Sequence, residues 1–207
     1  MSEGSTREER LRAYSKEDFS LYSRVTSGLA TLGGFRGDGK DKYGNPIPFG
    51  WGPHCVKFAR RVLGVTKPSR ILEIGLNLGY SSAIWLDLSN AVVVSVDISD
   101  KDETLHAART LFNRHPGRFE FICCDSREVE PKLVGWNFDM IFIDGDHTEP
   151  LVSNDIQLGL NLGVPWFVFD DYMPIYGPGT QPAIKKHGLE LVEVLENIAI
   201  ARLGTPL

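Results

Sequence analysis

The chain has 207 residues, of which 42% are hydrophobic, enough for one domain whose core is covered on both sides. Its formal net charge is −5, whereas proteins that bind nucleic acids usually carry clustered positive charge. The composition therefore favours a small-molecule partner. No apolar run resembles a secretory signal or approaches the roughly 20 residues of a membrane span, and we therefore expect a cytoplasmic protein without membrane attachment.

The first 52 residues differ in character from the rest of the chain. Apolar residues recur at helical spacing up to about Leu32, and the segment from Gly33 to Gly52 then combines many glycines with aromatic side chains. We predict N-terminal helices and a lid or pocket wall over residues 1–52, in front of a main domain at 53–207. A disordered surface loop is the alternative, because a high glycine content by itself indicates only mobility.

From residue 53 onward, helical patterns and apolar strand-like runs alternate without interruption. The predicted strands are Arg70–Ile74, Ala91–Val96, Arg118–Cys123, Phe138–Ile143 and Trp166–Phe169, followed by a hairpin of Leu189–Glu196 and Ile198–Leu203 around Asn197. The predicted helices run from Pro53 to Gly64, over Tyr80–Leu88, after a cap at Asp100, around Arg127–Val134, from Thr148 to about Leu162, and over Gly179–His187. Strands that are apolar on both faces are typical of a parallel sheet between helix layers, so the predicted class is α/β.

The segment from Ile71 to Ser82 has the pattern of a buried strand, a glycine turn and a helix start. Gly75 and Gly79 allow the backbone to turn tightly and a ligand to approach the helix N-terminus. The dinucleotide fingerprint would need glycines where Asn77 and Tyr80 stand, which argues against NAD. A turn without any ligand is the alternative.

This segment resembles the first motif of class I S-adenosylmethionine (SAM) methyltransferases, and with the strand order the resemblance covers about residues 53 to 203. It implies a Rossmann-like, seven-stranded mixed sheet with helices on both faces and an antiparallel last strand. It also implies a SAM site, for which the candidates are Glu73, Gly75, Asn77, Gly79, Ser81, Asp97, Asp125 and Ser126. In that family Asp97 would accept the ribose hydroxyls and Asp125 would face the adenine amino group, whereas Glu73 would hold the loop or the methionine ammonium. Ordinary caps are the alternative for both aspartates.

A second group of acids follows the fourth and fifth strands. Parallel neighbours would bring Asp144, Asp170 and Asp171 to one edge of the sheet, where like charges repel unless a cation neutralises them. Oxygen ligands suit Mg²⁺ or another divalent cation. The alternative is that Asp170 and Asp171 are solvated caps.

The second group resembles the metal-dependent O-methyltransferases, whose fourth strand ends in Asp-x-x-His. Carried over, Asp144, Asp170 and Asp171 are the metal ligands and His147 is the general base, although capping or packing of the turn is an alternative for His147. The chain departs from this family in two places, because relatives of the catechol type have asparagine where Asp171 stands, and many relatives have a Gly-Gly turn where this chain has residues 162–165.

We therefore predict a SAM-dependent O-methyltransferase, assisted by Mg²⁺, that methylates a hydroxyl of a sugar, a polyol or a phenol-like molecule. Trp51 and Tyr172 are candidates for the substrate wall. A metal-dependent hydroxylase or oxidoreductase on the same fold, and a SAM-binding protein without activity, are the alternative functions. The sequence leaves assembly into a homo-oligomer open.

Overall fold

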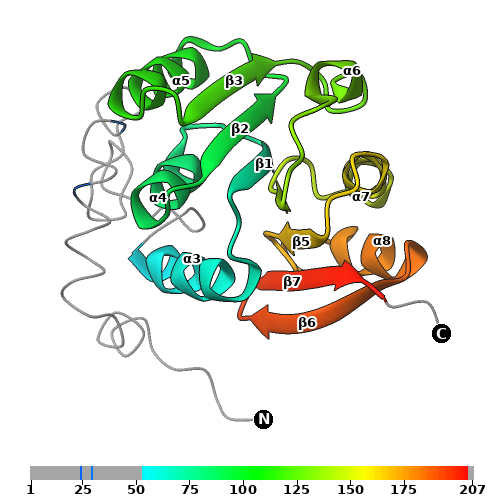
Figure 1. Ribbon diagram of the computed structural model, residues 1–207. Helices are drawn as coiled ribbons and strands as arrows, with labels where there is room; N and C mark the ends of the chain where they lie inside the picture. Colours follow the sequence, from blue (N-terminus) through cyan, green and yellow to red (C-terminus); the bar gives the residue numbers. More distant parts are fainter. Residues whose placement is uncertain (1–23, 25–28, 30–52, 205–207) are drawn as a thin grey trace.

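The computed structural model describes residues 24, 29 and 53–204 (Figure 1). The helices are α3 (Pro53–Thr66), α4 (Tyr80–Leu88), α5 (Asp102–Arg114), α6 (Glu130–Leu133), α7 (Glu149–Asn161) and α8 (Thr180–Lys186). The strands are β1 (Arg70–Ile74), β2 (Val92–Asp97), β3 (Phe119–Cys123), β4 (Met140–Ile143), β5 (Trp166–Phe169), β6 (Leu189–Leu195) and β7 (Ile198–Leu203). The predicted lid, including Trp51, and almost all of the predicted N-terminal helices lie outside the described residues.

The strands form one seven-stranded sheet in the order β3-β2-β1-β4-β5-β7-β6. Neighbours among β1 to β5 pair in parallel, and β7 pairs antiparallel with both β5 and β6. The predicted Rossmann-like sheet with an antiparallel last strand is confirmed. The chain builds outward from β1 through β2 to β3 and then returns to β4 on the other side of β1, and ligands of open α/β sheets bind at such a reversal.

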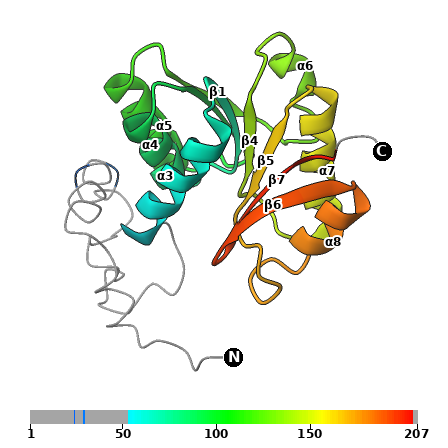
Figure 2. The same cartoon turned by 60° about the horizontal axis from the view of Figure 1, so that its bottom comes forward.

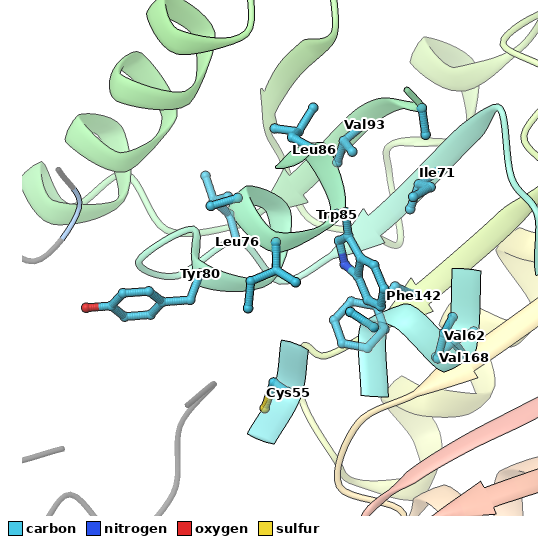
Figure 3. Packing of buried hydrophobic residues seen from close by; sticks show 14 of the residues in the cluster. Cys55, Val62, Ile71, Leu76, Tyr80, Trp85, Leu86, Val93, Phe142 and Val168 are labelled. Atoms are coloured by element: carbon cyan, nitrogen blue, oxygen red, sulfur yellow. The ribbon is translucent and has the colours of Figure 1, made fainter. Parts of the chain in front are cut away.

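Helices cover both faces of the sheet, as predicted (Figure 2). One hydrophobic cluster joins α3, α4 and α5 to the first face, and a second joins α6, α7 and α8 to the other. In the first cluster the rings of Trp85 and Phe142 meet edge to face with their centroids 5.4 Å apart (Figure 3). This packing places α4 against β4, and therefore fixes the turn that leads from β1 into α4.

Three helix boundaries differ from the prediction. α3 continues past Gly64 to Thr66, whose hydroxyl donates to the Val62 carbonyl at 2.9 Å. α5 begins at Asp102 after Lys101, so Asp100 is not its cap, and α6 is reduced to four residues. Local stop and cap signals are weak compared with the packing of a helix on the sheet, and they fix helix ends only to within a few residues.

The register of the sheet aligns the carboxyl ends of the strands on which the site depends. Ile74 of β1 lies beside Val96 of β2 and Ile143 of β4, and Ile143 lies beside Phe169 of β5. The residues that directly follow these four positions therefore meet at one edge of the sheet. They are Gly75, Asp97, Asp144 and Asp170. The carboxyl ends of β1, β2, β4 and β5 thus lie together, as the predicted parallel sheet requires.

Candidate functional site

The turn after β1 passes close to the end of β4. Gly75 has φ +100°, and its N–H donates to the Val96 carbonyl at 2.8 Å. A Cβ at this position would lie 2.2 Å from the Asp144 carbonyl oxygen, so a side chain does not fit. Gly79, with φ +75°, lies directly before α4, where a Cβ would come within 2.9 Å of Leu111. The two glycines form a bare backbone turn at the helix start, suited to close approach by a ligand.

Asp97, the last residue of β2, accepts hydrogen bonds from the glycine turn. Its Oδ2 accepts from the backbone N–H groups of Leu76 and Asn77, each at 2.8 Å, and its Oδ1 accepts from that of Ser99 at 2.8 Å. A carboxylate can accept about four hydrogen bonds, so acceptor capacity is left for a ligand hydroxyl. Asn77 itself is left-handed, with φ +48°, and completes the turn.

Glu73 lies in β1, fully buried beneath the glycine turn. Its Oε2 accepts from the hydroxyls of Ser82 and of Ser95, the latter at 2.6 Å, and Ser81 also hydrogen-bonds to the carboxyl. Burial raises the pKa of Glu73 to about 7, although the serine hydroxyls oppose the shift. Oε1 has no hydrogen-bond partner among the described residues. The hydrogen bonds of Glu73 thus join β1 to the start of α4 and to β2.

Glu73 should make folding stability depend on pH. The unfolded chain releases this proton near pH 4.5, but the folded protein keeps it until about pH 7, so stability falls as pH rises between these values. A shift of this size is worth about 3 kcal/mol. We expect the free energy of unfolding of the wild type to fall by about that much more than that of Glu73→Gln between pH 4 and 8. Urea unfolding across pH measures the difference; parallel curves would show that Glu73 ionises freely in the fold.

Asp125, predicted to face adenine, forms an ion pair with the guanidinium group of Arg127 in the structure. Arg127 donates its Nε to both carboxylate oxygens, at 2.9 and 3.1 Å, and its backbone N–H to Oδ1 at 2.9 Å. These bonds lower the pKa of Asp125 to about 2. The neighbouring Ser126 hydrogen-bonds to Asp155, a buried acid of α7 whose pKa burial raises to about 6. The loop after β3 is thus fixed to α7.

The acids after β4 and β5 are not equivalent. Asp144 and Asp170 share a side-chain hydrogen bond. The pKa of Asp144 is raised well above its ordinary value, first because its surroundings exclude water and next because of the negative charges of Asp170 and Glu73. Asp144 therefore ionises less readily than an ordinary aspartate.

Asp171 instead faces the only histidine predicted to act in the site. Its Oδ2 lies 3.2 Å from His147 Nε2, and its Oδ1 accepts from the Asn197 side-chain amide at 2.6 Å. About a quarter of each side chain is exposed, with values of 23% for His147 and 28% for Asp171. The imidazole is thus held by a carboxylate and remains partly exposed to solvent.

The predicted magnesium site has no support in this geometry. Among residues 53–204 no group of three or more His, Cys, Asp or Glu is placed to hold a metal ion. Asp144 and Asp170 face one another, but the Asp171 carboxylate is turned to His147 and Asn197. The three carboxylates predicted as ligands do not form one donor set here.

The structure also shows functional candidates that the sequence did not indicate. Ile98 follows Asp97 directly with 69% of its surface exposed, unusual for a large apolar side chain. Asn197 was recognised only as a turn residue, since nothing in the sequence connects it with Asp171. Tyr172 is half-buried against the second cluster, and its backbone N–H donates to the Asn197 carbonyl at 2.8 Å. Tyr172 therefore lies at the same edge of the sheet as Asp171, and its part in the substrate wall stays a prediction.

Comparisons with known proteins agree with the fold. Residues 72–172 match a family model described as a methyltransferase domain. A methyltransferase of Podospora anserina, solved with SAH bound, is 17% identical, with a TM-score of 0.67 over 99% of this chain and 100% of that one. An O-methyltransferase of Bacillus cereus in complex with SAH is 15% identical, with a TM-score of 0.61 over 94% of each chain. No curated protein sequence matches.

None of the described helices is long and apolar enough to cross a membrane.

The matched segment contains the glycine turn, Asp97, Asp125, His147 and the three acids after β4 and β5. SAH is the product that SAM leaves after giving up its methyl group, and it is bound in both of these compared structures. The family model thus marks a methyltransferase domain over residues 72–172, and the solved structures share the fold.

Proposed function

We propose that the protein transfers a methyl group from SAM to a hydroxyl oxygen of a small molecule, with His147 as the general base. The observation that carries this proposal is the pair of His147 and Asp171, whose nitrogen and oxygen lie 3.2 Å apart at the edge where the glycine turn also opens. An oxygen nucleophile needs a group that takes its proton, and an imidazole held by a carboxylate is suited to that task.

The residues at the turn fit SAM. The turn from Gly75 to Gly79 leads directly into the N-terminus of α4, Asp97 retains capacity to accept from a ribose hydroxyl, and exposed Ile98 offers an apolar surface to a purine ring. When bound, SAM supplies a methyl group on a sulfonium, which is activated toward a nucleophile. The protein then has to align the oxygen and help it lose its proton.

Asp171 would contribute by fixing the imidazole. A hydrogen bond from His147 Nε2–H to Oδ2 leaves Nδ1 as the basic nitrogen and directs the ring. After His147 takes the substrate proton, the carboxylate stabilises the resulting imidazolium. The half-buried position of both side chains strengthens this interaction relative to an exposed pair.

Magnesium assistance is kept as a prediction of the sequence, and no step above depends on it. The donors that could take part are Asp144 and Asp170, whose mutual hydrogen bond a cation would replace. Turnover after exhaustive chelation, with and without added Mg²⁺, is the relevant measurement. If chelation abolishes turnover and added Mg²⁺ restores it, the reaction requires the ion. Unchanged turnover after chelation would remove the ion from the mechanism.

The substrate experiment starts from the cofactor. Calorimetric titration should show SAM binding, and SAM with a labelled methyl group should then label members of a panel of sugars, polyols and phenols, with one SAH formed per methyl transferred. SAM binding without labelling of any hydroxyl, while amines or thiols are labelled, would contradict O-methylation. Consumption of O₂ would instead favour the hydroxylase alternative.

Asp97→Ala should weaken SAM binding by roughly 1.5–3 kcal/mol, the scale of hydrogen bonds to a charged group. The matched control is Asp139→Ala, because Asp139 Oδ2 also accepts two backbone N–H groups, from Ser69 and Arg70 at 2.7 and 2.9 Å, but at the opposite edge of the sheet. Both variants should lose stability, and only Asp97→Ala should lose SAM affinity in calorimetry. Equal SAM affinities would refute the ribose assignment.

The remaining expectations are a small-molecule partner, no nucleic-acid partner and a cytoplasmic location. They follow from the composition and charge of the chain, and they stay predictions together with homo-oligomer formation.

A further inference from the structure

Asn197 connects the end of the chain to the catalytic edge. It stands in the two-residue turn between β6 and β7, next to Glu196, which has φ +53°. The hairpin turn lies beside the segment that follows β5 (Figure 2). From this place Asn197 makes hydrogen bonds to three consecutive residues, Asp171, Tyr172 and Met173.

The three bonds use every polar part of the residue except its own N–H. The side-chain amide donates to Asp171 Oδ1 at 2.6 Å, the side-chain oxygen accepts from the Met173 N–H at 2.9 Å, and the backbone carbonyl accepts from the Tyr172 N–H at 2.8 Å. Only asparagine or glutamine has an amide donor and an amide acceptor at the end of one side chain, and glutamine is one carbon longer.

Asp171 needs such support because its backbone is unfavourable. Its φ is +49°, in the left-handed region that non-glycine residues adopt at some cost. With one carboxylate oxygen fixed by Asn197, the other is directed to His147. Without the amide, the carboxylate could rotate and the 3.2 Å contact with His147 would no longer be enforced.

The partner of Asp171 is held independently. The Gly179 N–H donates to the His147 carbonyl at 2.9 Å, and a Cβ on Gly179 would lie within 2.3 Å of the Thr148–Glu149 backbone. The histidine backbone is therefore fixed from the α8 side, whereas the aspartate side chain is fixed from the hairpin. The orientation of the pair then depends on one bond that can be removed by mutation, the bond from Asn197.

We propose that Asn197 is a positioning residue for methyl transfer, which acts by holding the Asp171 carboxylate toward His147. The proposal rests on the proposed function, since it requires His147 to act in the reaction. In this role Asn197 acts through Asp171 and not by contact with SAM or the acceptor. Its removal should consequently lower the rate of the chemical step and leave SAM binding in place.

The test is a double-mutant cycle on the full-length protein with its methyl acceptor. Asn197→Ala should lower kcat by about tenfold or more, with KM for SAM changed less than about twofold. In a His147→Ala background the same change should have almost no further effect on kcat, because two residues that act through one interaction are not additive. Asn137→Ala is the control, since Asn137 also lies in a turn, with φ +52°, and its side chain bonds only locally to Gly135.

Asn197→Asp guards against a folding defect. It keeps the acceptor for Met173 and the size of the side chain, but it replaces the donor to Asp171 with a carboxylate that repels it, and it should lower kcat at least as much as alanine does. Unchanged kcat in Asn197→Asp, or a loss of equal size in both backgrounds, would overturn the positioning role while His147→Ala still lowers the rate. If His147→Ala is itself without effect, both the proposed base and the positioning role are overturned.

Discussion

Replacement of His147 by alanine is expected to slow methyl transfer by about 10²–10⁴-fold, the range typical of a lost general base. SAM affinity should change little, because His147 makes none of the hydrogen bonds that hold the glycine turn. The N–H groups of that turn donate to Asp97 and to the backbone of β2. Single-turnover rates with saturating SAM and acceptor measure the chemical step directly. The acceptor is taken from the labelling panel described above.

The control is His106→Ala, which removes a half-buried histidine from α5, outside the predicted site. Thermal unfolding of both variants separates stability from rate. If His147→Ala loses stability but keeps its rate per folded molecule, His147 only packs the turn between β4 and α7, which is the alternative that the sequence left open. A slow variant with normal stability and SAM affinity supports its role as the base.

Gly75→Ala is expected to destabilise the fold by about 3–5 kcal/mol and to abolish measurable SAM binding. A Cβ there would lie 2.2 Å from a backbone oxygen that cannot move without separating β1 from β4, and φ of +100° is strained for alanine. Urea unfolding and calorimetry with SAM measure the two effects.

Gly64→Ala provides the comparison for Gly75. Gly64 lies within α3 and has no positive φ, and a Cβ added there would meet no atom within 4 Å, so alanine should be neutral or stabilise by up to about 1 kcal/mol. Equal stability of the two alanine variants would show that the turn after β1 can relax, and that close approach to β4 does not explain the glycine.

The order of elements was predictable because it depends on local patterns. Runs such as Trp166–Phe169 are apolar throughout, and a strand of this kind must be covered on both faces, which leaves few folds open. The turn at Gly75 was predictable for the same reason, since only glycine tolerates such φ and such proximity. Helix ends were less predictable, as α3 shows by continuing past Gly64.

The sequence by itself thus determined the α/β sheet, the glycine turn, and which acids stand at the carboxyl ends of strands. Only the tertiary structure decided what those acids face. Asp171 could point to a cation, to Asp170 or to His147, and the choice depends on Asn197, which is 26 residues away in the sequence. The sequence likewise did not determine that Asp125 pairs with Arg127, or that three backbone N–H groups donate to Asp97. A strand fixes where its last residue lies, but the side chain beyond it turns toward whichever partners the rest of the fold brings close.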